Sequence, residues 1–509
     1  MAEAVPVDGR SLTLEGFLAV VREGADARLT ADARSRLEAS RRDVDRIVES
    51  GAAIYGVTTG FGALSDRRVD RSQARELQHA LIASHASGVG PALPEDVVRG
   101  MLLLRANSLA RGHSGVRPDV VERLLELLNH HLLPRVPESG SVGASGDLAP
   151  LAHLALALTG EGEFVGHHDR VERAATVLQR GGILPLDLRE KEGIALVNGT
   201  ALMTSYLALA IDQARRLLDA GLVAAALTFD ALRGSPESLD DRLGEARHAP
   251  EERAIARAMR SMLIGSELAT KRREWIGQDP YTLRCIPQVL APVRHALRAA
   301  RTVLDGELNA TTDNPLLFEG EFVNGGKFHG QSLAWAMDSL ALAVHTLGAF
   351  SERRISRLVH PALNRGLPAF LAPEGGLSSG FMIPQTVAAA LVNESATLAY
   401  PASAQSIPTS ADQEDFVSMG AWAGAKLHRI LRNARRIVAI EWLVAGQALD
   451  LRRPARGGRG SQAALAALRS RVPHWTKDHS PSPEIERIAE EIGSGPLLDE
   501  VPFERSTFP

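Results

Sequence analysis

The stretch LALAIDQARRLLDAGLVAAALTFDAL, residues 207–232, has the periodicity of a long amphipathic helix. Its apolar residues recur every three or four positions, whereas Arg215, Arg216 and Asp219 fall outside the apolar stripe. Three further segments share this Ala- and Leu-rich pattern: 331–358, 384–399 and 419–449. Because long Ala-rich helices pack closely in bundles, the sequence predicts a mainly α protein with a long antiparallel helical bundle.

Other elements are predicted to be short. Runs of alternating β-branched residues are scarce, and short strands are expected only near 162–174 and 316–323. A helix is predicted around 483–492, ahead of a frayed C-terminal tail. The apolar stretch 334–350 is interrupted by charged and polar residues, which indicates a buried helix rather than a membrane span.

Composition favours a globular protein that acts on a small molecule. Hydrophobic residues make up 45% of the 509 residues, and the composition stays even from about residue 10 to residue 450, which favours one large module. The 57 basic and 61 acidic residues are well mixed, so no basic surface indicates a nucleic-acid partner. The single cysteine, Cys285, excludes an intramolecular disulfide and suits the cytoplasm, and the N-terminus lacks the pattern of a signal peptide.

The tripeptide Ala-Ser-Gly occurs twice, at residues 86–88 and 144–146. If the amide nitrogen of Gly146 attacks the carbonyl carbon of Ala144 and water is lost, a five-membered ring closes. Loss of water from Ser145 then leaves an exocyclic methylidene, an electrophile that no ordinary side chain supplies. Glycine suits the attacking position because it has no Cβ to obstruct the tight turn.

The surroundings of the two copies differ. The first copy follows an apolar helical stretch, 77–84, and is interpreted as a helix end. The second lies among small residues before Asp147, which is expected to cap a helix over 150–158. From the tripeptide alone, a glycine-rich loop with a capping aspartate remains the better interpretation of the second copy.

The wider sequence changes that interpretation. The segment Gly140–His153, GSVGASGDLAPLAH, resembles the signature of the aromatic amino acid ammonia-lyases. Seven other blocks agree with that family in the same order: YGVTTGFG at 55–62, LVNGT at 196–200, QDPYTLRC at 278–285, TDNP at 312–315, GGKFH at 325–329, SGFM at 379–382 and QEDFVSM at 413–419. The resemblance covers roughly residues 10 to 475, and several independent blocks are more specific than one tripeptide.

The resemblance implies a fumarase/aspartase-like lyase fold and a built-in prosthetic group. That group is 4-methylidene-imidazol-5-one (MIO), formed from Ala144, Ser145 and Gly146, with no external cofactor and no metal. Family members are homotetramers whose sites are completed by neighbouring subunits. The expected organisation is an N-terminal part over 1–195, which carries the Tyr55 loop and the MIO segment, a long-helix bundle over 196–475, and a C-terminal helix and tail over 476–509.

The resemblance also implies roles for individual residues. Tyr55 is the expected base that removes the β-proton, in a loop that could close over the substrate. Arg284 is the expected holder of the substrate carboxylate, because a guanidinium matches two carboxylate oxygens. Gln278 and Tyr281 share its spacing and could face the same side. By the same resemblance, Asn198 lies beside the MIO carbonyl or the substrate carboxylate. Phe328 is expected to pack near the ring.

Two residues indicate the substrate side chain. Ser84-His85 resembles the histidine ammonia-lyase version of its segment, and Glu414 stands where phenylalanine and tyrosine lyases usually carry glutamine. A carboxylate suits an imidazole or an ammonium group. Three positions depart from the histidine lyase pattern: Lys327, Tyr400 and Phe416.

The sequence therefore predicts deamination of L-histidine to trans-urocanate and ammonia. The alternatives are a tyrosine or phenylalanine ammonia-lyase, an aminomutase of the same family, or a non-catalytic helical scaffold. A metal hydrolase is disfavoured, because the pairs His130-His131 and His167-His168 diverge around a helix and the chain has no His-Glu-x-x-His motif.

Overall fold

The computed structural model describes residues 4–166, 170–270, 277–372 and 374–505, and the chain divides by its internal contacts into two compact units. The first comprises the chain up to Leu209, with Arg301–Met337 and Pro401–Ala425. The second comprises Ala210–Ala300, Asp338–Tyr400 and the chain from Lys426. The three-part division predicted from the sequence stays a prediction.

Helices of moderate length dominate the first unit. They are α1 (Leu14–Arg22), α2 (Ala31–Glu49), α3 (Ala74–His85), α4 (Glu95–Ala110), α5 (Pro118–Asn129), α6 (Leu148–Leu158), α7 (Ala174–Gly181) and α8 (Glu192–Val197). The hydroxyl groups of Thr13 and Thr30 cap α1 and α2 by accepting hydrogen bonds from backbone N–H groups of the first turn. Every residue of α4 from Val97 onward is buried, so α4 is the central helix of this unit.

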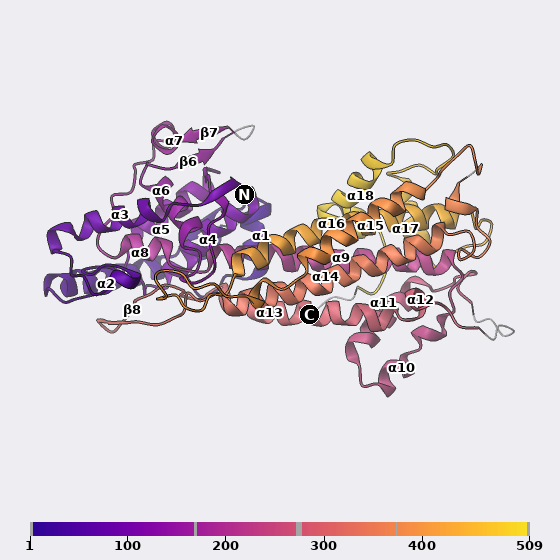
Figure 1. The fold of residues 1–509 in the computed structure, drawn as a ribbon, viewed down its shortest axis with the longest axis horizontal. Coiled ribbons are helices and arrows are strands. Elements are labelled where there is room, and N and C mark those ends of the chain that lie inside the picture. The colour runs from indigo at the N-terminus through magenta and orange to yellow at the C-terminus, as the bar shows by residue number, and fades with distance from the viewer. Residues whose placement is uncertain (1–3, 167–169, 271–276, 373, 506–509) are drawn as a thin grey trace. The chain divides into compact units, whose positions relative to one another are not determined.

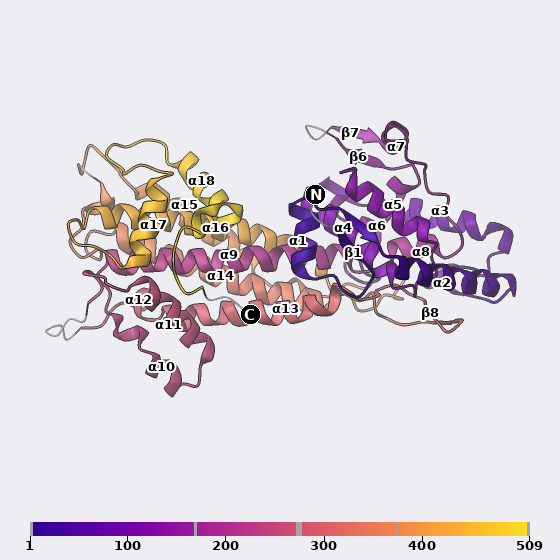
Figure 2. The same ribbon diagram turned by 180° about the vertical axis from the view of Figure 1, so that it is seen from behind.

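Among the described residues, four small sheets complete the first unit. Strands β1 (Val5–Val7) and β2 (Ala27–Leu29) pair in parallel; β3 (Val89–Ala92) pairs antiparallel with β5 (Pro137–Ser139), and β8 (Leu316–Phe318) with β9 (Glu321–Val323). Strand β6 (Glu163–Val165) lies between β4 (Leu133–Pro134) and β7 (Val171–Arg173), and β7 leads directly into α7 (Figure 2). The strands predicted near 162–174 and 316–323 are confirmed.

Long helices form the core of the second unit. Four of them contribute residues to both units: α9 (Ala201–Ala231), α13 (Ile286–Glu307), α14 (Gln331–Val359) and α16 (Gly420–Asp450). The second unit also contains α10 (Asp241–Ala246), α11 (Pro250–Met262), α12 (Tyr281–Arg284), α15 (Met382–Leu398), α17 (Arg459–Arg469) and α18 (Ser482–Ser494). Figure 1 shows α9, α14 and α16 side by side. The predicted mainly α fold with few short strands is confirmed.

A buried carboxylate joins these three helices. Glu441 of α16 accepts hydrogen bonds from Thr228 of α9 at 2.8 Å and from Ser351 of α14 at 2.5 Å. Arg354 of α14 adds a two-pronged ion pair to Glu441, with N···O distances of 2.5 and 2.7 Å. Because a buried charge is costly unless it is paired and hydrogen-bonded, this network fixes how α9, α14 and α16 pack.

The apolar segment predicted as a buried helix lies in α14. Among the described residues, α14 is the one helix long and apolar enough to cross a membrane, with a mean hydropathy of 1.3 over its most apolar part, of which 56% is buried in the protein. Asp338 within it is buried and forms an ion pair with Lys426 of α16, with an N···O distance of 2.9 Å. These contacts are those of a core helix. The tail predicted to fray extends into residues 506–509, which lie outside the described residues.

Candidate active site

One pocket of the first unit gathers five of the predicted site residues: Tyr55, His85, Ser145, Asn198 and Glu414. Its volume is about 520 Å³, which falls in the range of small-molecule sites. Apolar side chains from α3 and α8 form much of the remaining wall. The pocket therefore combines a largely apolar surface with a few polar groups of differing chemistry.

Tyr55 is held by an ordered loop. The side chain of Thr59 accepts a hydrogen bond from Gly56 N at 3.2 Å, and Gln78 of α3 donates to the Gly56 carbonyl at 3.0 Å. The phenolic oxygen of Tyr55 accepts a hydrogen bond from Gly62 N at 3.0 Å. A backbone N–H aimed at the phenol oxygen would stabilise negative charge there, as a base requires.

The Ala144–Gly146 tripeptide turns tightly against a second backbone segment. Gly143 and Gly146 have φ angles of +68° and +71°, a region that favours glycine. Gly146 pairs with Gly199 in a parallel bridge, and Asp147 N donates to the Gly199 carbonyl at 2.7 Å. A Cβ at Gly146 would lie 2.2 Å from that carbonyl oxygen, so no other residue fits this position without movement.

Glu414 binds the hydroxyl group of Ser145. Ser145 Oγ donates to Glu414 Oε1 at 2.7 Å, and Thr409 Oγ1 donates to Glu414 Oε2 at 2.6 Å. Residues 409 and 414 also form an antiparallel bridge, which fixes the loop that carries the carboxylate. The side chain predicted to recognise the substrate therefore contacts the residue predicted to become the electrophile.

His85 occupies the last turn of α3, where the first Ala-Ser-Gly copy follows the helix end, as predicted. Ser84 Oγ lies 3.1 Å from His85 Nδ1. Burial lowers the pKa of His85 below its usual 6.5, and the nearby Glu414 carboxylate opposes that effect in part. A neutral imidazole at this place can both donate and accept a hydrogen bond.

Asn198 ends α8 and is almost fully buried, with 4% of its surface exposed. Its Nδ2 donates to the Asn314 carbonyl at 3.1 Å, whereas its Oδ1 has no hydrogen-bond partner among the described residues. Because buried polar atoms are normally paired, this oxygen is an unsatisfied acceptor in a residue that lines the pocket.

Asp147 differs from its prediction. Helix α6 begins at Leu148, but the Asp147 carboxylate makes no capping bond to it. The Oδ2 atom accepts instead from Leu202 N at 2.9 Å and from Met203 N at 3.2 Å, in the first turn of α9. The predicted cap of the following helix is therefore wrong, because α9 brings its own unpaired N–H groups closer to the carboxylate.

Asp147 is expected to make stability depend on pH. Burial raises its pKa to about 7 from 3.8, against the lowering effect of its hydrogen bonds. The folded chain therefore binds a proton that the unfolded chain loses near pH 4, so the free energy of unfolding should fall between about pH 4 and about pH 7, by up to about 4 kcal/mol. In Asp147→Asn, thermal unfolding should show a smaller fall across that range. The exposed control Asp119→Asn should keep the parent slope; an equal slope in Asp147→Asn would contradict the assignment.

The remaining predicted residues lie outside the pocket lining. Phe328 is half-buried in the loop between β9 and α14. Gln278, Tyr281 and Arg284 belong to the second unit, whereas every residue that lines the pocket belongs to the first. They do form one cluster at α12: Arg284 donates to Gln278, and its guanidinium carbon lies 4.8 Å from the centre of the Tyr281 ring.

Several pocket residues were not predicted from the sequence. Leu77, Ala80 and Leu81 line the pocket beside Ser84 and His85. Their spacing of three and four residues along α3 places them on one helix face, so this signal was present in the sequence. By contrast, the pocket residues Phe61 and Ser410 lie in loops, whose positions local periodicity does not report.

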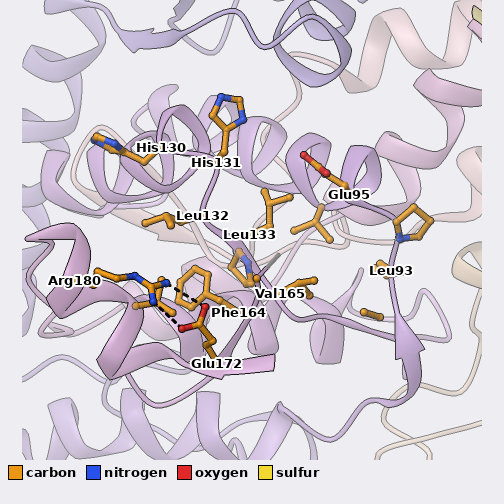
Figure 3. Close-up of a pocket in the computed structure, with 16 residues that line it drawn as sticks. Leu93, Glu95, His130, His131, Leu132, Leu133, Phe164, Val165, Glu172 and Arg180 are labelled. Carbon is orange, nitrogen blue, oxygen red and sulfur yellow. Dashed lines mark hydrogen bonds and ion pairs between the residues drawn. The ribbon is translucent and has the colours of Figure 1, made fainter. Parts of the chain in front are cut away.

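A second cavity, of about 740 Å³, is shown in Figure 3. It lies by β4, β6 and α7, and it contains none of the predicted site residues. Its Arg180 and Glu172 bind each other at 2.8 and 3.1 Å, so their charges are already satisfied. Within the described residues, no group of three or more His, Cys, Asp or Glu is placed to hold a metal ion; His167 and His168 lie outside them.

The family model described as "Aromatic amino acid lyase" matches residues 12–470. The chain belongs to the aromatic amino acid lyase family. It is 51% identical to the histidine ammonia-lyase of Deinococcus radiodurans over 493 residues, which is 96% of this chain and 94% of that protein. The predicted family is confirmed, and with it the predicted class of enzyme, a lyase.

Solved structures of the family share the fold. The crystal structure of tyrosine aminomutase from Streptomyces globisporus matches with a TM-score of 0.93 and 39% identity, over 98% of each chain. Histidine ammonia-lyase from Trypanosoma cruzi matches with a TM-score of 0.91 and 38% identity, over 99% of this chain and 97% of that one. Similarity of fold alone therefore does not separate a lyase from an aminomutase.

Proposed function

We propose that this protein removes ammonia from L-histidine, giving trans-urocanate. The observation that carries the proposal is the pocket in which Glu414 and His85 lie together beside Ser145. A carboxylate and a neutral imidazole offer an imidazole side chain both a charge-assisted acceptor and a hydrogen-bonding partner. The similarity to histidine ammonia-lyase from Deinococcus radiodurans supports the same substrate.

The residues at 144–146 fit the MIO group that the family resemblance implies. Gly146 leaves no room for a side chain, and the positive φ angles of Gly143 and Gly146 turn the backbone around the tripeptide. The buried, unpaired Asn198 Oδ1 offers an acceptor in the same pocket. When formed, the group supplies an electrophile that takes up the substrate amine and makes it a better leaving group. No external cofactor is proposed.

The side chains of the pocket divide the remaining work. Tyr55 accepts the β-proton at its phenolic oxygen, which the Gly62 N–H holds in place by a hydrogen bond of 3.0 Å. Glu414 and His85 orient the substrate imidazole, and the largely apolar walls exclude water around it. Asn198, which lines the pocket, lies beside the MIO carbonyl or the substrate carboxylate, as the family resemblance implies.

The substrate carboxylate is assigned to Arg284 with Gln278 and Tyr281. Arg284 packs on Tyr281 and donates to Gln278, so its guanidinium is held in place for a two-pronged contact with a carboxylate. We assign this cluster to a site shared between subunits of a homotetramer. The apolar face of α15, with Ile383 and Val387 exposed, supports burial against another copy.

Light scattering of the purified protein should give about four times the mass of one chain. A monomer would contradict the assignment.

A cytoplasmic location is proposed with this function. The single cysteine, Cys285, suits a reducing compartment.

The tyrosine aminomutase similarity keeps one alternative open, in which ammonia returns to the β-carbon of tyrosine. Phe416, with 60% of its surface exposed, and Lys327, also exposed, mark positions where this chain departs from histidine lyases.

A substrate panel tests the proposal. The purified enzyme should convert L-histidine with growth of urocanate absorbance, and it should turn over L-tyrosine and L-phenylalanine far more slowly. Product analysis for β-amino acids separates a lyase from an aminomutase. Turnover of tyrosine without turnover of histidine would overturn the substrate assignment, and a β-amino acid product would overturn the reaction.

Glu414→Gln should change the outcome of the same panel. The amide keeps the size of the side chain but loses the charge that binds the imidazole, so kcat/KM for L-histidine should fall by about ten- to hundredfold. Turnover of L-phenylalanine, which has no group to pair with the carboxylate, should fall less or rise. Exposed Glu486→Gln in α18 is the matched control and should leave both rates unchanged. An equal loss for both substrates would assign Glu414 a role other than substrate selection.

A further inference from the structure

Arg105 lies against the backbone that contacts the tripeptide. A Cβ at Gly199 would lie 2.1 Å from Arg105 Nη1, just as a Cβ at Gly146 would lie 2.2 Å from the Gly199 carbonyl oxygen. Real Cβ atoms essentially never approach other atoms within 3.0 Å. The Gly199 backbone therefore contacts both the tripeptide and the guanidinium group, with no space for a side chain at either glycine.

Hydrogen bonds fix this arrangement. Arg105 Nη1 donates to the Asn198 carbonyl at 2.9 Å, and Asp147 N donates to the Gly199 carbonyl at 2.7 Å. Thr200 N donates to Thr312 Oγ1 at 3.3 Å. Arg105 thus holds the Asn198–Gly199 peptide through the Asn198 carbonyl. Asp147, the residue after the tripeptide, holds the next peptide through the Gly199 carbonyl.

Among the described residues, the Asn198–Gly199 peptide is the hydrogen-bond partner of Arg105. Two further charged side chains, Lys191 and Asp313, are buried like Arg105. Lys191 Nζ donates a hydrogen bond to Asp313 Oδ2 at 2.6 Å, so this carboxylate is paired with Lys191. The Nε and Nη2 atoms of Arg105 have no hydrogen-bond partner among the described residues, which leaves the Asn198 carbonyl as the acceptor that it contacts. Burial lowers the pKa of Arg105, and Asp313 opposes that effect. An apolar side chain would fill the same space at a lower desolvation cost.

We propose that Arg105 is a positioning residue for the self-processing of Ala144, Ser145 and Gly146. It holds the Asn198–Gly199 peptide against Gly146, so that the Gly146 nitrogen stays close to the Ala144 carbonyl carbon. This inference rests on the proposed function, since it concerns how the prosthetic group of that function forms.

The processing balances without any other reactant. The Gly146 nitrogen bonds to the Ala144 carbonyl carbon, and the Ala144 oxygen leaves as water with the amide hydrogens of Ser145 and Gly146. The Ser145 hydroxyl then leaves as a second water with the hydrogen of the Ser145 Cα. Ring closure needs the two reacting atoms in close and fixed proximity, and loss of that alignment slows such a step by roughly ten- to hundredfold.

Mass spectrometry of newly made chains tests the role of Arg105. A cell-free system synthesises the parent protein and the variants Arg105→Met and Arg105→Gln. The mass of the peptide that contains residues 144–146 is measured at successive times. The parent peptide should lose the mass of two water molecules. Both variants should lose it at least about tenfold more slowly, while their thermal unfolding midpoints stay near that of the parent. The Arg105→Gln variant serves as the test if the Arg105→Met variant does not fold.

Arg99→Met is the matched control. Arg99 lies six residues earlier on α4, is also buried, and donates to the Val20 and Val21 carbonyls rather than to the site. In Arg99→Met, the peptide that contains 144–146 should lose two water molecules at the parent rate. Processing of a folded Arg105 variant at the parent rate would overturn the inference and leave the proposed function intact. Absence of the two-water loss in the parent would instead overturn the proposed function itself.

Discussion

Ser145→Ala is expected to lose lyase activity by at least about a thousandfold, because no other side chain in the pocket can supply the electrophile. The alanine also removes the hydroxyl that binds Glu414 at 2.7 Å, which leaves the carboxylate without one of its two hydrogen bonds. Urocanate absorbance measures the activity on L-histidine, and mass spectrometry measures the mass of the peptide that contains residues 144–146.

Ser87→Ala provides the matched control, since it makes the same change in the other Ala-Ser-Gly copy. Ser87 follows the end of α3 and does not line the pocket. This variant should keep the parent activity, and its 144–146 peptide should still lack the mass of two water molecules. Full activity in Ser145→Ala would remove the proposed electrophile, and with it the chemistry of the whole site.

Tyr55→Phe is expected to lower kcat by about a hundred- to ten-thousandfold, the usual contribution of a general base. Phenylalanine keeps the ring, which meets Phe61 edge-on at 6.5 Å, but it removes the oxygen that accepts from Gly62 N. KM for L-histidine should change little, because Tyr55 acts on the β-proton rather than on substrate binding. The 144–146 peptide should still show the full loss of two waters.

Tyr206→Phe removes a hydroxyl from a buried tyrosine of α9 that does not line the pocket. It should keep kcat near the parent value and so control for a general effect of losing a buried hydroxyl. If Tyr55→Phe lost activity only through incomplete processing of the tripeptide, the mass measurement would show it, and the role of Tyr55 as base would be rejected.

Local sequence predicted the helices α9, α14, α15 and α16, but it did not predict others, among them α2, α4 and α13. The helical periodicity of 207–232 corresponds to most of α9, and the patterns at 331–358, 384–399 and 419–449 correspond to α14, α15 and α16. Such predictions succeed because an apolar stripe reports which face of a helix is buried, whatever packs against it. The boundaries shifted by a few residues, since helix ends depend on caps from distant residues, as at α9.

The resemblance to a known family predicted roles for the tripeptide, the Tyr55 loop and the side chains proposed for substrate recognition, because family motifs consist of residue types in a fixed order along the chain. Tertiary structure decided which of them meet. Glu414 reaches Ser145 across 269 positions of the chain, and Asp147 binds the first turn of α9 instead of its own helix. Arg105 contacts the Asn198–Gly199 peptide from a helix whose periodicity shows only that it is buried. Hydrogen bonds and close contacts between distant segments are set by how the helices pack, and no local pattern encodes that packing.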